Sequence, residues 1–270
     1  MFVRASSFAR PSAARSLLNL NFARNTSSTA SKSKKPVPRP GIDRIGVPFD
    51  PYVPMRMSRL PSPLTAPRVY LKSIWNRLLL FAYNQVQVYY FKKSMGKKYK
   101  PNFLKWKNEA IETFVRVNKG FAEKKLASIR TNVSQYVYDA LEARTNRMPA
   151  STTMGWELVK FNSVPKIISV HSFPHEDGVP LLLQIVYRFD TRQQLVVKKA
   201  GQDAQNNVRD LTEYLAFNID PFTDRIVLAG SVFESPVSRG VAPKEGGGRE
   251  EILAQMKAHG DIYRIEQSQE

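Results

Sequence analysis

The fold is decided by residues 68–130, which read RVYLKSIWNRLLLFAYNQVQVYYFKKSMGKKYKPNFLKWKNEAIETFVRVNKGFAEKKLASIR. The first half of this stretch interleaves aromatic residues with Lys and Arg. The second half repeats apolar residues at a spacing near 3.6, which predicts an amphipathic helix. The repeat includes Phe103, Ala110, Phe114, Val117 and Phe121. We therefore expect a helix from residue 103 whose apolar side founds the core of a globular domain, followed by a second helix that ends before residue 149.

The chain between residues 153 and 233 changes to a period of two. The clearest alternation is at residues 181–189, where Leu183, Ile185 and Tyr187 alternate with polar or smaller residues. Short alternating segments of this kind predict an antiparallel sheet. We expect a turn at residues 190–192, and residues 203–220 fit neither pattern. Helices followed by strands predict an α+β domain, with the N-terminal helices packed on one face of a curved antiparallel sheet.

Charge is distributed unequally along the chain. Residues 1–130 hold 26 Lys and Arg against 5 Asp and Glu, whereas residues 131–270 hold 15 against 18, and the whole chain has a net charge of +18. This asymmetry predicts a docking half for a phosphate-rich partner, either nucleic acid or anionic lipid. The sequence has no Cys, which excludes a disulfide scaffold, a thiolate zinc site and a Cys nucleophile.

The N-terminal region divides by composition. Residues 1–33 are rich in Arg and Ser with apolar residues between, which is typical of a mitochondrial transit peptide, and a disordered basic tail is the alternative. Residues 34–67 contain nine prolines and predict a disordered basic arm without long helices or central strands. The docking domain is expected at residues 68–235, and a linker with a short C-terminal helix at residues 236–270.

Residues 69–91 predict a helix with an apolar stripe. The stripe consists of Trp75, Leu78, Leu79, Ala82, Val86 and Tyr89 or Tyr90. It fits the domain core, which is the more frequent fate of such a stripe and our preferred prediction. It also fits a membrane interface, with Lys72, Arg77, Lys92 and Lys93 reaching the head groups. Amides at residues 84, 85 and 87 interrupt the apolar run, so it is too polar to span a bilayer, which takes about 20 apolar residues.

Ten cations of this region are the candidate contacts to rRNA or to anionic lipid. They are Arg68, Lys72, Arg77, Lys92, Lys93, Lys97, Lys98, Lys100, Lys105 and Lys107. Lys and Arg neutralise phosphates without reading a sequence, so the surface is suited to either polyanion. The alternative for each of these residues is an ordinary solvated charge.

One cluster of residues suggests metal binding. It consists of His171, His175, Glu176 and Asp177. Imidazole and carboxylate groups are metal ligands, but Pro174 and Gly178 in the same segment favour turns, and we prefer a polar hairpin turn. The glycines at 246–248 lack the Lys and Ser or Thr of a phosphate-binding loop. We predict neither a metal nor a cofactor.

An enzyme of this fold class would require a polar pocket. Such a pocket would join His171 to Asp190 or Asp210. We expect a filled apolar interior instead and predict no catalytic residue.

The order of these features resembles that of a known family. The stretch NFLKWKNEAIETFVRVNKGFAEKKL (residues 102–126) looks like its first domain helix, and GWELVKFNSVPKIISVHSF (155–173) and LLLQIVYRFDTRQQLVV (181–197) look like its first strands. The family is that of the fungal inner-membrane mitoribosome receptors (the Mba-one family). It is related to mitoribosomal large-subunit protein L forty-five and to the C-terminal domain of Tim forty-four. The resemblance covers about residues 60–235 and implies a cystatin- or NTF2-like α+β cone.

The resemblance also implies a function. Members are peripheral proteins on the matrix face of the mitochondrial inner membrane. They bind the mitoribosome large subunit near the tunnel exit and align it with the Oxa-type insertase, so that nascent membrane proteins insert during translation. Two alternatives remain open, a permanent structural subunit of the large subunit and a scaffold of the import motor. The motor scaffold requires a chaperone-recruiting N-terminal region, for which the short proline-rich arm is poorly suited.

Overall fold

The computed structural model describes residues 39–97, 99–174, 178–199, 201, 203–242 and 247–265, all within one compact unit, Arg39–Glu270. The helices in these ranges are α1 (Pro67–Met95), α2 (Phe103–Ala122), α3 (Gln135–Arg147) and α4 (Arg249–Gly260), with short 3-10 helices η1 (Ile42–Arg44), η2 (Met57–Arg59) and η3 (Leu126–Asn132). The strands are β1 (Thr153–Pro174), β2 (Pro180–Lys198), β3 (Gln205–Ile219) and β4 (Ile226–Val232). The predicted transit peptide lies outside the described residues.

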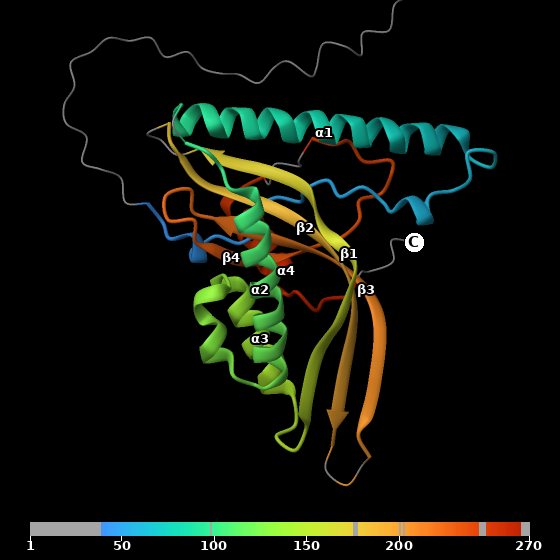
Figure 1. Cartoon of the computed structure of the whole chain (residues 1–270), viewed down its shortest axis with the longest axis vertical. Coiled ribbons are helices and arrows are strands. Elements are labelled where there is room, and N and C mark those ends of the chain that lie inside the picture. Colours follow the sequence, from blue (N-terminus) through green and yellow to red (C-terminus); the bar gives the residue numbers. More distant parts are fainter. Residues whose placement is uncertain are drawn as a thin grey trace, which may run out of the picture. The chain divides into compact units, whose positions relative to one another are not determined.

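The four strands form one antiparallel sheet in the order β1-β2-β3-β4, so each strand pairs with its neighbour in the chain. Figure 1 shows a curved, twisted sheet with α2 and α3 across one side and α1 along one end. The predicted α+β class, with helices on a curved antiparallel sheet, is confirmed.

The main core lies between α2, α3 and one face of the sheet. Leu183, Ile185, Tyr187 and Phe189 of β2 are fully buried there, as their alternation predicts. Phe114 of α2 stacks on Phe189, with ring centroids 4.8 Å apart. The apolar stripe of α2 therefore packs on the sheet as expected, and this packing fixes the helix across the strands.

The opposite face of the sheet is covered by the chain that precedes α1. Val47 and Val53 pack against Val186 of β2 and its neighbours. The buried amide of Asn218 donates hydrogen bonds to the carbonyls of Ile42 and Ile45. The expectation of a disordered arm is therefore wrong for residues 39–66, because apolar residues between the prolines bury themselves on a second sheet face. The remainder of the arm, residues 34–38, lies outside the described residues.

Strand β2 runs through the position where the sequence predicts a turn. Residues 190–192 do not reverse the chain, because they stay paired with β1 and β3 on both sides. The Asp190 carboxylate accepts hydrogen bonds from Ser163 of β1 (2.6 Å) and Thr212 of β3 (2.8 Å) and pairs with Arg188 (2.8 Å). These bonds and the Arg188 charge lower the pKa of Asp190, although burial acts to raise it. The predicted turn is therefore wrong, and the unassigned residues 203–220 contain β3.

The segment after the sheet also belongs to the compact unit. Arg144 of α3 donates two hydrogen bonds of 2.7 Å to the carboxylate of Asp261, which follows α4. Ile262 is buried in the main core. The boundaries predicted at residues 67/68 and 235/236 thus both lie within the compact unit Arg39–Glu270.

Candidate interaction surface

The predicted cations form two groups at opposite ends of α1. Arg68 and Lys72 lie in its first turns, and Lys92 and Lys93 lie in its last turn. A helix of 29 residues is about 43 Å long, so the two groups are on the order of 30 Å apart. Four more candidates, Lys97, Lys100, Lys105 and Lys107, follow the second group in the loop and in α2, and Arg77 lies between the two groups. Lys98 lies outside the described residues.

Three of the candidates have internal partners. Arg77 donates to the carbonyl of Met55, and Lys72 donates to the carbonyl of Ser238 (3.1 Å). Lys105 pairs with Asp224 at 3.1 Å. These contacts bind the preceding chain, the segment after β4 and the β3–β4 loop to the helices.

The other described candidates lack an ion-pair partner among the described residues. They are Arg68, Lys92, Lys93, Lys97, Lys100 and Lys107. Charges of this kind remain available to an outside polyanion. The strongest candidate for an anion-binding patch is therefore the end of α1 with the loop to α2.

The apolar stripe of α1 faces outward. Of the predicted stripe, Trp75 is 61% exposed, Leu78 57% and Tyr89 62%, whereas Leu79 is half-buried. Phe81, beside the stripe, is 65% exposed. The preferred prediction, that this stripe packs on the domain core, is wrong. Its periodicity identified one face of the helix correctly, but that face is not covered by any described part of the chain.

The inward face of α1 combines polar contacts with a few buried apolar residues. Asn84 donates to the carbonyl of Ile168 (2.9 Å) and accepts from the N–H of Val170 (3.0 Å), and Gln87 accepts from the N–H of Ser172 (3.1 Å). These backbone groups are on the outer edge of β1, which has no strand beside it in the sheet. Two amide side chains therefore replace a neighbouring strand, which satisfies edge groups that would otherwise lack partners.

The same face continues toward the start of α1. Buried Asn76 donates to the hydroxyl of Tyr52 (3.3 Å) and to the carbonyl of Arg239 (3.2 Å). Ser73 is buried one turn earlier, and among the apolar residues only Leu80 and Phe91 are buried along the helix. Helix α1 thus differs from an ordinary surface helix, since its inner face is of mixed polarity and many of its large apolar residues lie on the outer face.

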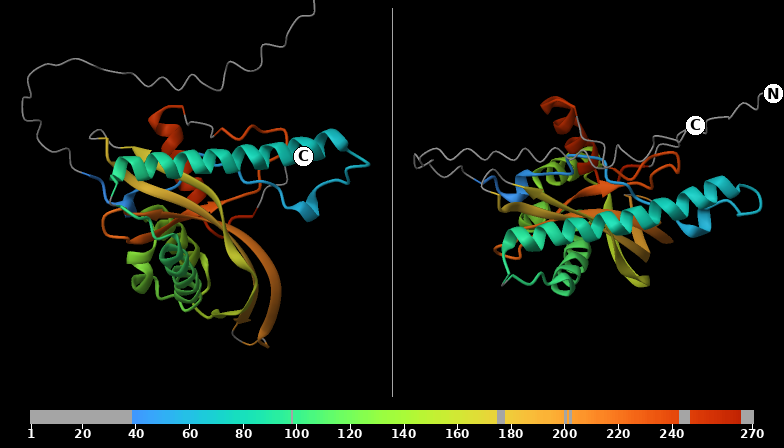
Figure 2. Two further views of the ribbon diagram at one scale, coloured as in Figure 1. Left: turned by 45° about the horizontal axis from the view of Figure 1, so that its top comes forward. Right: turned by 90° about the horizontal axis from the view of Figure 1, so that it is seen from above.

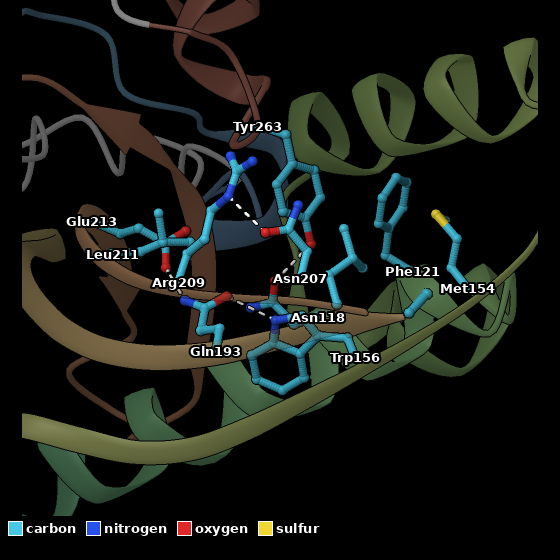
Figure 3. Close-up of a pocket in the computed structure, with 12 residues that line it drawn as sticks. Asn118, Phe121, Met154, Trp156, Gln193, Asn207, Arg209, Leu211, Glu213 and Tyr263 are labelled. Atoms are coloured by element: carbon cyan, nitrogen blue, oxygen red, sulfur yellow. Dashed lines mark hydrogen bonds between the residues drawn. The ribbon is translucent and has the colours of Figure 1, made fainter. Parts of the chain in front are cut away.

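The expectation of a filled apolar interior is wrong at the other end of the sheet, where the structure contains a pocket. Figure 3 shows a pocket of about 340 Å³ between α2, the long strands and Tyr263. Gln193 is central to it: its amide accepts from Trp156 Nε1 (2.8 Å) and donates to Glu213 (2.6 Å). Burial raises the pKa of Glu213, and the Gln193 hydrogen bond opposes this shift. The polar groups of the pocket thus bind one another.

The polar pocket predicted for an enzyme of this class would be lined by His171 and by Asp190 or Asp210. All three residues are absent from the lining of the pocket in the structure. His171 instead packs edge-on to the Phe49 ring (centroids 4.3 Å apart) and lies 3.2 Å from the Tyr83 hydroxyl, so it belongs to the contact between α1, β1 and the preceding chain. Burial lowers its pKa to about 4.

A metal site is not formed by the residues that the structure describes, since no three His, Asp or Glu side chains gather in them. Of the predicted cluster, His175, Glu176 and Asp177 lie outside those residues. No described helix is long and apolar enough to cross a membrane.

Comparison with known proteins identifies the family. Residues 30–268 match the MBA1-like protein family. The chain belongs to this family. The inner membrane mitoribosome receptor MBA1 of Saccharomyces cerevisiae is 38% identical to this MBA1-like chain over 252 residues, which cover 93% of this chain and 89% of that protein. The family suggested by residues 102–126, 155–173 and 181–197 is thereby confirmed.

A solved structure shares a more distant likeness. The intermembrane-space region of the chloroplast protein ARC6 aligns with a TM-score of 0.34 and 10% identity over 50% of this chain and 99% of that one. A likeness this weak has no bearing on the function of the MBA1-like chain.

Proposed function

We propose that this protein is a mitoribosome receptor on the matrix face of the mitochondrial inner membrane. The observation that carries the proposal is the 38% identity to a yeast protein named as an inner membrane mitoribosome receptor, over nearly the whole length of both chains. The yeast relative is named as a receptor and not as an enzyme.

The proposed partners rest on the charge of the surface and on the resemblance to the receptor family. The cations of the loop after α1 bind rRNA of the large subunit near the tunnel exit, and the cations of α1 itself bind anionic lipid, which holds the protein on the membrane. The bound ribosome is thereby aligned with an Oxa-type insertase, and nascent membrane proteins are inserted as they are made. Attachment is peripheral, in keeping with the described helices, none of which spans a bilayer.

Charge reversal in the loop after α1 tests the ribosome contact. The variant Lys97→Glu, Lys98→Glu, Lys100→Glu should co-sediment with mitoribosomes much less than the wild type at moderate salt, because each lost phosphate contact weakens binding. The matched control, Lys160→Glu, Lys166→Glu, Lys198→Glu, makes the same charge change at exposed positions of β1 and β2 and should bind normally. Equal binding by all three proteins would refute this assignment of the site.

A salt-graded fractionation of mitochondria tests the receptor role itself. The proposal predicts that the protein leaves the ribosome fraction at a salt concentration at which the large subunit stays intact. A permanent structural subunit would stay with the large subunit throughout, and an import-motor scaffold would not fractionate with ribosomes.

A further inference from the structure

We propose that the outward face of α1 inserts into the interfacial layer of an anionic bilayer, with the helix lying parallel to the membrane plane. This inference rests on the proposed membrane association and names the element that makes it. The face consists of Leu71, Trp75, Leu78, Phe81, Ala82, Val86 and Tyr89, all exposed. Residues 71, 75, 78, 82 and 89 recur at intervals of three, four or seven, which places them in one line along the helix.

The fold itself does not account for these apolar side chains. The helix is attached through the amides of Asn76, Asn84 and Gln87 and a few buried apolar residues on the other face. An exposed row of large apolar residues is unfavourable in water and marks a surface that meets another apolar phase. Since the inner face already fixes the helix, the outer face is free to serve a partner.

The charge of α1 indicates that this partner is an anionic lipid surface. Pro67–Met95 contains no Asp or Glu, and its exposed cations, Arg68, Lys72, Lys92 and Lys93, flank the apolar row at both ends. An interfacial helix has this composition, with large apolar residues in the acyl boundary and cations at the level of anionic head groups. Trp and Tyr rings also concentrate at this boundary.

The position of α1 permits such contact along its length. Figure 1 shows α1 along one end of the compact unit, with α2, α3 and the long strands on one side of it, and Figure 2 shows the full length of the helix from two further directions. From Trp75 to Tyr89 the row is about 21 Å long. It therefore forms a ridge that can reach a flat surface without displacing another described element.

A second copy of the chain is a poorer occupant of the same face. Antiparallel pairing of two α1 helices would bring Arg68 and Lys72 of one copy against Lys92 and Lys93 of the other, and parallel pairing would bring each group against itself. Both arrangements oppose like charges, and α1 has no acidic residue to offset them. Lipid phosphates instead neutralise both groups together.

Vesicle flotation of the full chain tests the inference. The vesicles are phosphatidylcholine with cardiolipin, and the variant is Trp75→Glu, Leu78→Glu. We expect its partition coefficient to fall by about tenfold or more, since burial of each large apolar side chain in a nonpolar phase contributes at least about tenfold. High salt should leave part of the wild type on the vesicles and release all of the variant, because salt screens the lysines and not the apolar contact.

The matched control is Val164→Glu, Val208→Glu. It adds two acids at exposed apolar positions of the sheet, 65% and 43% exposed, and should float like the wild type. Circular dichroism should show that all three proteins are folded. Flotation of the Trp75 and Leu78 variant at the wild-type level would overturn the inference.

Mitoribosome co-sedimentation without vesicles separates this inference from the proposed function. If the variant floats normally and binds ribosomes, only the role of α1 is refuted. If the wild type floats but does not bind ribosomes, the receptor proposal fails and the lipid contact stands. If the wild type does not float and the variant is lost from mitochondrial membranes, the face binds a membrane protein, and the lipid proposal is overturned.

Discussion

The two long helices of this protein differ in where they place their large apolar residues. Helix α2 directs Trp106, Phe114 and Val117 inward, where all are buried, and is mostly polar outside. Helix α1 directs amides inward and large apolar side chains outward. Figure 1 shows why they differ: α2 crosses a sheet face, whereas α1 follows the end of the sheet, where it meets the edge of β1. A sheet face needs apolar cover, and a strand edge needs hydrogen bonds.

This difference teaches that an apolar stripe in the sequence locates the apolar side of a helix. It does not predict whether the domain core or an outside partner covers that side. On α2 the stripe stabilises the fold. On α1 the stripe is available to a partner, while hydrogen bonds to a strand edge hold the helix in place. The following substitutions separate the two cases.

The largest effect is expected for truncating an inward ring of α2. Phe114→Ala should lower the free energy of unfolding by about 3–5 kcal/mol, since it removes a stacked ring and leaves a cavity beside Phe189. The matched change on α1, Phe81→Ala, should alter it by less than about 0.5 kcal/mol, because Phe81 is exposed. Urea unfolding measures both. A comparable loss in the two variants would show that the outer face of α1 supports the fold.

A smaller effect is expected for the amides on the inner face of α1. Asn84→Ala leaves the Ile168 carbonyl and the Val170 N–H without their partner and should cost about 2–3 kcal/mol of unfolding free energy. The neighbouring Gln85 is exposed, so Gln85→Ala should be nearly neutral. Hydrogen exchange should also show faster exchange at Val170 in the Asn84 variant. Unchanged stability would mean that water replaces Asn84 at the edge of β1.

Acidification should weaken the contact between α1 and β1 by protonating His171. Its pKa is lowered to about 4 by burial, from 6.5 in the unfolded chain, so the unfolded chain takes up a proton first as the pH falls below 6.5. This costs about 2 kcal/mol of stability at pH 5 and nothing above pH 7. His171→Phe should remove that part of the pH dependence. Burial also lowers the pKa of His259, which titrates in both proteins. An identical pH profile for both would exclude His171 as the source.

The sequence predicts well what local periodicity determines. The helix from Phe103 and the inward alternation of Leu183 to Phe189 appear as expected, since each pattern lies within a single element. The cover of each face is less predictable, because it comes from distant parts of the chain. The covering of the second sheet face by Val47 and Val53 and the pairing of Asn84 with the edge of β1 are contacts of this kind.

The candidate interaction surface is likewise predictable in its location but not in its contacts. Composition locates the cationic region, but only the fold shows that Arg77 and Lys105 have internal partners while Lys92 and Lys93 remain exposed. One signal for the outward stripe was present in the sequence. Residues 67–95 contain no acid, and the amides that interrupt the apolar run include residues 84 and 87, which hold the edge of β1.

The most direct test places a probe on the outward face of α1. The chain has no Cys, so Leu78→Cys gives a single site for an environment-sensitive fluorophore, and Val164→Cys gives a matched exposed site on β1. With cardiolipin-containing vesicles, the probe at residue 78 should shift its emission to the blue and be quenched by lipids that carry a quencher in the acyl chain, whereas the probe at residue 164 should not change. An unchanged, water-exposed emission at residue 78 in the vesicle-bound protein would contradict the insertion of α1.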